Sequence, residues 1–370
     1  MKKSQKKTYS VVDLFCGCGG IALGFKEAGF SILAGLDNWE AAMETFQRNF
    51  PATKPYCRAI EKAPSRSVFK DLGLAPGELD VLVGGPPCQG FSLAGNRKHD
   101  DPRNNLVHEF IKFVKEAGPK AFLMENVLGI LSSRNGLVKQ DILKRFREIG
   151  YDVEVRDLYA HYFGVPQMRR RIFFVGNRIG KPILWPEQTH WGLRDGSNGL
   201  DLPKGMRRFV TVGEAISDLP LLAKNKGREV MDYVRSAGSA YQEQMRRCSK
   251  KIYNHVASNH SAQTVKVIAY VPEGGNWKDL PKRFQNIRSY SNTWRRLHSK
   301  KVSVTIDCGH RHHFHYKANR VPTVRESARI QSFPDHFRFY GSKTSQFAQV
   351  GNAVPPLLVK SIAEEIKKIL

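Results

Sequence analysis

Short apolar runs alternate with amphipathic stretches through the first 180 residues, and this alternation decides the fold class. Six runs predict strands, at residues 9–15, 31–38, 79–85, 120–127, 151–160 and 170–178. Apolar residues at helical spacing predict helices at 21–30, 39–50, 105–118 and 136–150. Alternating strands and helices favour an α/β fold with a parallel, doubly wound, Rossmann-like sheet covered on both faces. Ligands of such sheets bind beyond the carboxyl ends of the strands.

The alternation stops after residue 178. Residues 179–320 are irregular and hold eight of the twelve histidines, and helical patterns return at 323–333 and 355–370. We therefore predict one sheet domain, built from 1–178 and 321–370, that is interrupted by a smaller domain at 179–320.

The inserted stretch is also strongly basic. The chain carries 59 Lys and Arg against 34 Asp and Glu, and residues 181–320 alone hold 25 against 11. Such a surface suits a polyanion, with binding that weakens as salt rises, although a basic soluble protein without such a partner has the same composition.

Other classes of protein are disfavoured by composition. Six cysteines at irregular spacing, with no C-x-x-C pair, support neither a disulfide framework nor structural zinc. No run of about 18 apolar residues predicts a membrane span. The basic N-terminus lacks the apolar region of a secretory signal, so we expect a cytoplasmic protein.

A glycine-dense turn follows the first predicted strand. Its sequence, Gly17-Cys18-Gly19-Gly20, fits the dinucleotide pattern G-x-G-x-x-G only loosely. Asp37 ends the second strand and Trp39 follows, so a carboxylate could bind ribose hydroxyls and an indole could cover an adenine. The turn predicts an adenosyl or adenine-nucleotide ligand; the alternative is a tight turn with ordinary packing.

A thiol, a carboxyl group and two guanidinium groups follow later strands. Cys88 stands between a Pro-Pro pair and Gln-Gly, Glu125 ends a strand, and Arg169 and Arg171 begin another. A free cysteine is most often a small buried hydrophobe. With a carboxyl group and guanidinium groups nearby, however, the thiol could attack an electron-poor ring.

Six motifs, in order, resemble those of the cytosine-C5 DNA methyltransferase family, in particular its bacterial restriction-modification members. They are DLFCGCGG, GGPPCQGFS, ENV, QMRRR, RESARIQSFPD and QVGNAVPP. The resemblance covers nearly the whole chain. It implies an S-adenosylmethionine-dependent methyltransferase that needs no metal.

The resemblance also implies residue roles. Cys88 would attack cytosine C6, Glu125 would hydrogen-bond N3 and the exocyclic amine, and Arg169 and Arg171 would hold O2 and support the loop around Cys88. Cofactor contacts would be Phe15, Gly17, Gly20, Asp37, Trp39, Pro87, Leu106, Asn352 and Val354. Where the family carries an Asp-Ile pair that contacts adenine, this chain has Ala59 before Ile60; Glu61 or a backbone group could substitute.

The family resemblance makes 179–320 the target-recognition domain, acting on double-stranded DNA from which the cytosine is flipped. Plausible recognition elements are 273–281, 289–297 and 302–316. The last contains Cys308 and four histidines, for which we favour a DNA-facing or structural role over zinc.

Three other functions stay open at this point. They are tRNA cytosine methylation, a catalytically inactive DNA-binding protein, and an NAD oxidoreductase, which the glycine spacing disfavours. We expect a monomer that protects DNA from a cognate restriction endonuclease acting on the same site.

Overall fold

The computed structural model describes residues 8–87, 105–193, 195–199, 201–285, 294–309 and 312–370. Two compact units divide the chain. The first consists of Met1–Tyr159, Arg170–Glu187 and Leu358–Leu370, and the second of Ala160–Arg169 and Gln188–Leu357. Residues 321–357 thus cluster with the second unit, whereas the predicted functional boundary lies at 320/321. The assignment of 179–320 to DNA reading stays a prediction.

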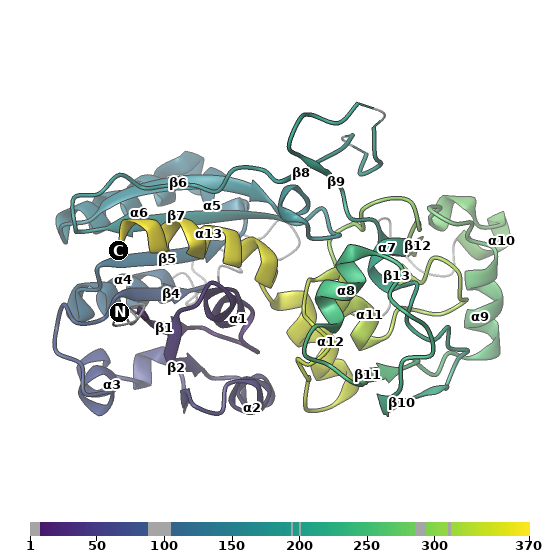
Figure 1. Cartoon of the computed structure of the whole chain (residues 1–370), viewed down its shortest axis with the longest axis horizontal. Helices are drawn as coiled ribbons and strands as arrows, with labels where there is room; N and C mark the ends of the chain where they lie inside the picture. The colour runs from purple at the N-terminus through teal and green to yellow at the C-terminus, as the bar shows by residue number, and fades with distance from the viewer. Residues whose placement is uncertain (1–7, 88–104, 194, 200, 286–293, 310–311) are drawn as a thin grey trace, which may run out of the picture. The chain divides into compact units, whose positions relative to one another are not determined.

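A seven-stranded sheet forms the centre of the first unit (Figure 1). Its strands are β1 (Ser10–Leu14), β2 (Ser31–Asp37), β3 (Lys54–Cys57), β4 (Val81–Gly84), β5 (Ala121–Asn126), β6 (Asp152–Tyr159) and β7 (Arg170–Asn177). Their order is β3-β2-β1-β4-β5-β7-β6. The six predicted strands are confirmed, and the sheet adds β3, which the sequence analysis did not predict.

The sheet is parallel from β3 through β5, but β7 runs antiparallel to both β5 and β6. The predicted α/β fold with a doubly wound, Rossmann-like sheet is confirmed, and β7 is the strand of this sheet that departs from the predicted parallel direction. Only residues 160–169 connect β6 to β7, and so short a link cannot carry the crossover that parallel neighbours need.

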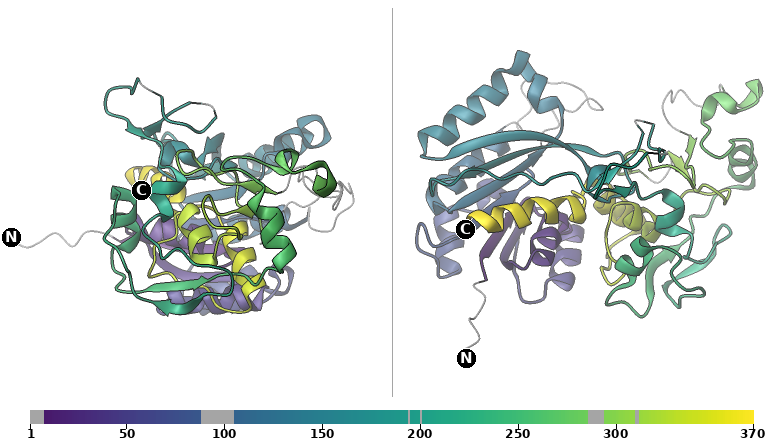
Figure 2. Two further views of the ribbon diagram at one scale, coloured as in Figure 1. Left: turned by 90° about the vertical axis from the view of Figure 1, so that its right-hand side faces the viewer. Right: turned by 45° about the horizontal axis from the view of Figure 1, so that its top comes forward.

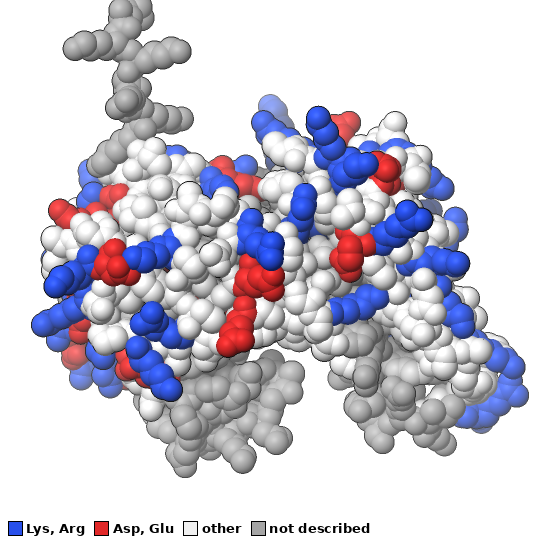
Figure 3. Space-filling model, turned by 90° about the horizontal axis from the view of Figure 1, so that it is seen from below, with Lys and Arg blue, Asp and Glu red and all other residues white. Residues whose placement is uncertain are grey.

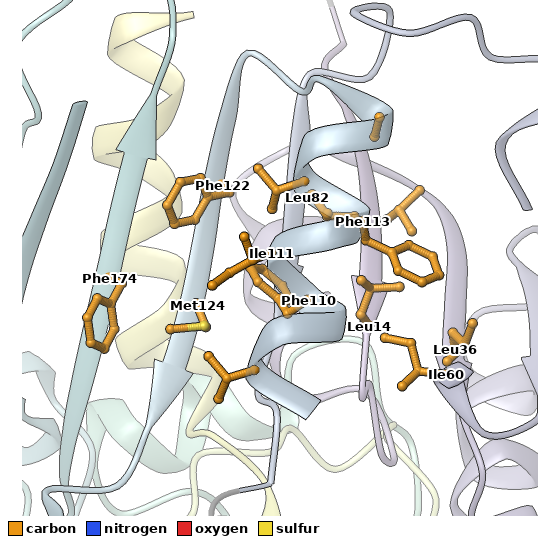
Figure 4. Close-up of a cluster of buried hydrophobic side chains, with 14 of the residues drawn as sticks. Leu14, Leu36, Ile60, Leu82, Phe110, Ile111, Phe113, Phe122, Met124 and Phe174 are labelled. Atoms are coloured by element: carbon orange, nitrogen blue, oxygen red, sulfur yellow. The ribbon is translucent and has the colours of Figure 1, made fainter. Parts of the chain in front are cut away.

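Helices cover both faces of this sheet. They are α1 (Gly20–Glu27), α2 (Glu40–Asn49), α3 (Ser65–Asp71), α4 (Leu106–Ala117), α5 (Gly129–Ser132), α6 (Leu137–Glu148) and α13 (Pro356–Ile369). One face packs under α4, whose Phe110 and Phe113 meet buried strand residues such as Leu82 and Met124 (Figure 4). Helix α13 lies behind these strands in Figure 4, beside α1 in Figures 1 and 2. Its Lys367 donates to the Ala28 carbonyl at 2.7 Å.

Short elements and long connections make up the second unit. The strands are β8 (His190–Trp191), β9 (Arg207–Arg208), β10 (Gly227–Met231), β11 (Ile252–Val256), β12 (Arg295–Arg296) and β13 (His313–Phe314). The helices are α7 (Val212–Ile216), α8 (Ala240–Arg246), α9 (Ala262–Ala269), α10 (Lys282–Gln285), α11 (Val324–Ile330) and α12 (Lys343–Asn352). The predicted helix at 323–333 is thus confirmed as α11.

Buried ion pairs hold α11 in place. Arg329 is fully buried and its guanidinium donates to Asp335 at 2.6 Å and to Asp218 at 3.1 Å. Arg320 and Glu326 form a two-bond pair at 2.7 and 2.8 Å. Burial alone would raise the pKa of Glu326, but the Arg320 charge holds it well below its usual range. The Arg329–Asp218 bond joins α11 to a residue 111 positions earlier in the chain, and this contact helps to hold α11 in the second unit.

Candidate active site

The glycine-dense turn between β1 and α1 has the backbone that its sequence predicts. Gly17 and Gly19 have φ of 51° and 100°, in the left-handed region that favours glycine. A Cβ at Gly19 would come within 2.5 Å of the Phe50 ring, whereas one at Gly17 would meet no atom of the described residues within 4 Å. No described residue therefore fills the space beside Gly17, and glycine at position 19 is needed for packing.

Asp37 holds this turn through both carboxylate oxygens. Oδ2 accepts from the Gly17 N–H at 2.9 Å, and Oδ1 accepts from the Trp39 N–H at 2.9 Å. Burial raises the pKa of Asp37, and these N–H donors oppose that rise. The Asn38 N–H is a third backbone donor, and a carboxylate has about four lone-pair sites, so Asp37 can accept one further bond from a hydroxyl group. Asp37 therefore stabilises the turn and is also a candidate hydrogen-bond acceptor for a ligand hydroxyl group.

Sequence reasoning did not find a second carboxylate, Asp13, which lies at the base of the same turn. Its side chain is fully buried, and Oδ2 accepts from the Ala22 N–H at 3.0 Å. Burial raises the pKa of Asp13 well above its usual range. The sequence could have indicated this residue, because Asp13 is a carboxylate within the largely apolar strand β1. A buried carboxylate in such a strand needs a hydrogen-bond donor, which here is a backbone N–H.

Ala59 lies two residues after β3 and is the N-cap of a 3₁₀ helix (Ile60–Lys62). Its methyl group cannot accept a hydrogen bond, so no side chain caps this helix. In register, Cys57 of β3 pairs with Asp37 of β2, so this end of β3 lies at the same edge of the sheet as Asp37. The Glu61 side chain is exposed to solvent. The chain therefore has no aspartate at the position where the motif expects one.

The Pro-Cys loop begins next to β5. Asn126 Nδ2 donates to the Pro86 carbonyl at 3.2 Å, and a Cβ at Gly85 would come within 3.1 Å of Glu125 Oε2. The first part of the loop is thus held against the end of β5. Pro87 is exposed, and Cys88 lies outside the described residues.

Glu125 pairs with Arg171 across β5 and β7. Arg171 Nε lies 2.8 Å from Glu125 Oε1, and the two side chains are 17% and 12% exposed. Arg170 turns to the other neighbouring strand and pairs with Asp157 of β6. Neighbouring residues of a strand point to opposite faces, so Arg170 and Arg171 have different partners.

Arg169 belongs to the second unit and has different surroundings. It precedes β7, is 2% exposed, and donates to the carbonyls of Ile306 at 3.2 Å and Gly351 at 2.8 Å. Its neighbour Gln167 is fully buried and accepts from the Ile306 N–H at 2.9 Å. The structure therefore shows Arg169 bound to backbone of its own unit, and a contact with a base stays a prediction.

The remaining predicted cofactor residues fall in two places. Phe15 and Gly20 flank the turn, with Phe15 at φ 55°, and the half-buried Leu106 is the first residue of α4. Asn352 ends α12 in the second unit, where its Oδ1 accepts from the Cys308 thiol at 2.6 Å. Val354 is buried two residues later.

The histidine-rich segment contains an acid–base pair. His312 Nδ1 contacts the Asp307 carboxylate, while Cys308 contacts Asn352. Among the described residues, no group of three or more His, Cys, Asp or Glu could hold a metal ion. His310 lies outside those residues.

Lys and Arg side chains are spread over the surface seen in Figure 3, with Asp and Glu in small groups between them. In the part of the chain that the structure describes, no helix is both long and apolar enough to cross a membrane.

Comparison with known proteins adds the family. Residues 9–368 match the model of the C-5 cytosine-specific DNA methylases. The chain is 37% identical to the type II methyltransferase M1.HphI of Haemophilus parahaemolyticus, with 97% of this chain and 86% of that protein covered. It is also 37% identical to M.DdeI of Desulfomicrobium norvegicum, with 96% and 88% covered.

A solved structure agrees. A DNA modification methyltransferase encoded within an E. coli prophage matches with a TM-score of 0.78 and 25% identity, covering 98% of this chain and 99% of that one. The match of the family model over nearly the whole length, together with these relatives, shows that the chain belongs to the C-5 cytosine-specific DNA methylases and is a DNA (cytosine-5-)-methyltransferase.

Proposed function

We propose that this methyltransferase modifies one cytosine within a specific sequence of double-stranded DNA, with Cys88 as its covalent nucleophile. The observation that carries the proposal is the Glu125–Arg171 pair at the end of β5, next to the start of the Pro-Cys loop. A carboxyl group and a guanidinium group held 2.8 Å apart can bind the ring nitrogen and the carbonyl oxygen of one cytosine. The loop that leads from Pro86 would bring the Cys88 thiolate to the same ring.

The proposed chemistry starts with addition of the Cys88 thiolate to C6. As the S–C6 bond forms, the C5–C6 π electrons move to C5, and Glu125 in its protonated form donates its proton to N3, which stabilises the ring. Arg171 holds O2 and keeps the Glu125 carboxyl group in place. After C5 has gained its methyl group, loss of the C5 proton restores the double bond and expels the Cys88 thiolate.

We propose S-adenosylmethionine as the methyl donor, which leaves as S-adenosylhomocysteine. Space beside Gly17 that is empty of described residues and the remaining acceptor site of Asp37 fit an adenosyl group, and the half-buried Trp39 could cover the adenine. Phe15, Gly20, Pro87 and Leu106 complete the proposed contacts from the first unit. Asn352 and Val354 are proposed on their motif alone. Ala59 stands where the family has an aspartate that contacts adenine. We therefore propose that a backbone group at this position contacts the adenine instead.

The DNA would be bound by the basic stretch at 179–320, and the target base would be flipped out at a cost of a few kcal/mol. Exposed Arg207 and Arg208 of β9 can bind phosphates, as can the lysines of the same region. We prefer DNA over tRNA because this stretch is long and carries an excess of 14 positive charges.

We further propose a monomer that works in the bacterial cytoplasm, bound to the nucleoid. There it would protect DNA from a cognate endonuclease. The support is that the relatives at 37% identity are named type II methyltransferases.

Bisulfite sequencing of DNA from cells that express the chain tests the proposal. We expect 5-methylcytosine at one position of one short sequence, and none with Cys88→Ala. Methylation of tRNA without methylation of duplex DNA would refute the DNA substrate, and full methylation by Cys88→Ala would refute the nucleophile.

A further inference from the structure

One segment, Leu297–Cys308, connects much of the second unit through backbone hydrogen bonds. Its Ser299 and Lys301 carbonyls accept from the first residues of α7 at 2.8 and 2.9 Å. Its Val302 N–H donates to Gly196, in the connection between β8 and β9, at 2.8 Å. Its Leu297 N–H donates to Phe314 of β13 at 2.9 Å. The Leu297–Cys308 segment therefore touches several elements of the region proposed to read DNA.

Arg169 joins the end of this segment to the end of α12, and Gln167 holds the same residue of the segment. Gln167 Oε1 accepts from the Ile306 N–H at 2.9 Å, so the side-chain amide fixes the backbone on the N-terminal side of Ile306. Arg169 donates with one terminal nitrogen to the Ile306 carbonyl and with the other to Gly351, at 3.2 and 2.8 Å. One planar guanidinium thus bridges two segments that are distant in sequence.

Close packing makes this junction tight. A Cβ at Gly351 would lie 2.3 Å from the Asp307 carbonyl oxygen, so only glycine lets the two backbones approach. The next residue, Asn352, accepts from the Cys308 thiol at 2.6 Å. The side chain of Asn352 is therefore oriented by the same segment that Arg169 fixes.

We propose that Gln167 and Arg169 are positioning residues, which hold Asn352 for the cofactor and tie it to the DNA-reading segment. This rests on the proposed function, in which Asn352 contacts S-adenosylmethionine. The proposal separates the two arginines of the QMRRR motif. Arg171 acts on the base beside Glu125, while Arg169 acts on the cofactor through Gly351 and Asn352.

Coupled binding follows from this arrangement. The Leu297–Cys308 segment bonds to elements of the region proposed to read DNA and also orients Asn352 for the cofactor. Target DNA that orders this segment should therefore tighten cofactor binding. A coupling of about 5-fold or more is typical of linked sites.

The test is calorimetric titration of the full chain with S-adenosylhomocysteine, with and without a duplex that contains the sequence found by bisulfite mapping. Lysine at position 169 keeps the charge but loses the planar fork, so it cannot bond both carbonyls. For Arg169→Lys we expect an S-adenosylhomocysteine Kd about 10-fold higher and a smaller coupling to DNA. For Arg171→Lys we expect an unchanged S-adenosylhomocysteine Kd and a large fall in kcat.

Arg296→Lys is the matched control. Arg296 is 5% exposed and also bonds backbone carbonyls, including Val271 at 2.6 Å and His315 at 3.0 Å. None of the hydrogen-bond partners of Arg296 among the described residues is Ile306, Gly351 or Asn352. Arg296→Lys should therefore leave the S-adenosylhomocysteine Kd unchanged.

A second variant decides the matter if Arg169→Lys does not fold. Cys308 is exposed, so Cys308→Ala should fold and raise the Kd by about 2- to 10-fold, and Cys308→Ser, which keeps a donor, should restore it. Wild-type affinity in both Arg169→Lys and Cys308→Ala would overturn the positioning role alone. A wild-type chain that binds no S-adenosylhomocysteine would overturn the proposed function as well.

Discussion

Replacing Glu125 by glutamine separates its chemical role from its structural one. The change keeps the shape of the side chain but removes the charge that faces Arg171 Nε at 2.8 Å. Because both side chains are largely buried, the pair keeps most of the strength of a charge-assisted hydrogen bond, about 1.5–3 kcal/mol. Glutamine retains a weaker bond, so we expect a loss of stability of about 1–2 kcal/mol, which corresponds to a fall in Tm of roughly 2–8 °C.

The expected loss of activity is much larger. A glutamine cannot stabilise positive charge at N3, and proton transfer by a positioned group contributes about 100-fold to 10,000-fold to a rate. Single-turnover transfer of labelled methyl groups, at saturating DNA and cofactor, should therefore slow by about 100-fold or more. DNA affinity should change little.

Asp157→Asn provides the control. This change breaks the neighbouring cross-strand ion pair between Asp157 and Arg170, whose side chains are 26% and 38% exposed respectively. It should lower the free energy of unfolding by at most about 1 kcal/mol and leave the rate of methyl transfer unchanged. The reasoning fails if Glu125→Gln transfers methyl groups within about 3-fold of wild type, or if Asp157→Asn is equally slow.

Three further changes test other parts of the structure. Gly85→Ala places a methyl group 3.1 Å from Glu125 Oε2, so we expect kcat to fall about 10-fold or more with little change in Tm; an unchanged kcat would contradict this. Asp13→Asn removes a buried carboxylate whose pKa is raised above its unfolded value, mainly by burial. Stability from such a group is present below its unfolded pKa of about 4 and is lost as pH rises through the folded pKa, so the variant should gain Tm over wild type as pH rises to 8. A lower Tm for this variant at pH 8 would show that the bond from the Ala22 N–H needs the charge. Arg329→Met removes the cation that two buried carboxylates share, so that Asp218 keeps only Arg246 at 2.8 Å and Asp335 only Arg325 at 3.8 Å among the described ion pairs. The change should cost about 3–5 kcal/mol in thermal unfolding, whereas a loss under about 1 kcal/mol would show that the network is dispensable.

Six strands of the first unit and its helices α1, α2, α4, α6 and α13 could be predicted because each buries apolar residues at a regular period, whereas the short helices α3 and α5 were not predicted. Strand β3 escaped prediction because Lys54–Cys57 is short and contains a proline. The direction of β7 depends on the length of the link before it, which the periodicity of the strand does not report.

The separate surroundings of the two motif arginines could not be predicted from alternation. Arg169 and Arg171 are two residues apart, but β7 begins at Arg170, so the rule that places i and i+2 on one face does not govern Arg169. Its partners Ile306 and Gly351 stand more than 130 residues away along the chain. Contacts of this range depend on tertiary packing.

The claim that matters most is covalent attack by Cys88. DNA in which 5-fluorocytosine replaces the target base cannot lose its C5 substituent as a proton, so the adduct should persist. Mass spectrometry of the digested complex should find this base attached to the peptide that contains Cys88, in the presence of S-adenosylmethionine. An adduct on another residue, or none in an enzyme that methylates normal DNA, would contradict the mechanism.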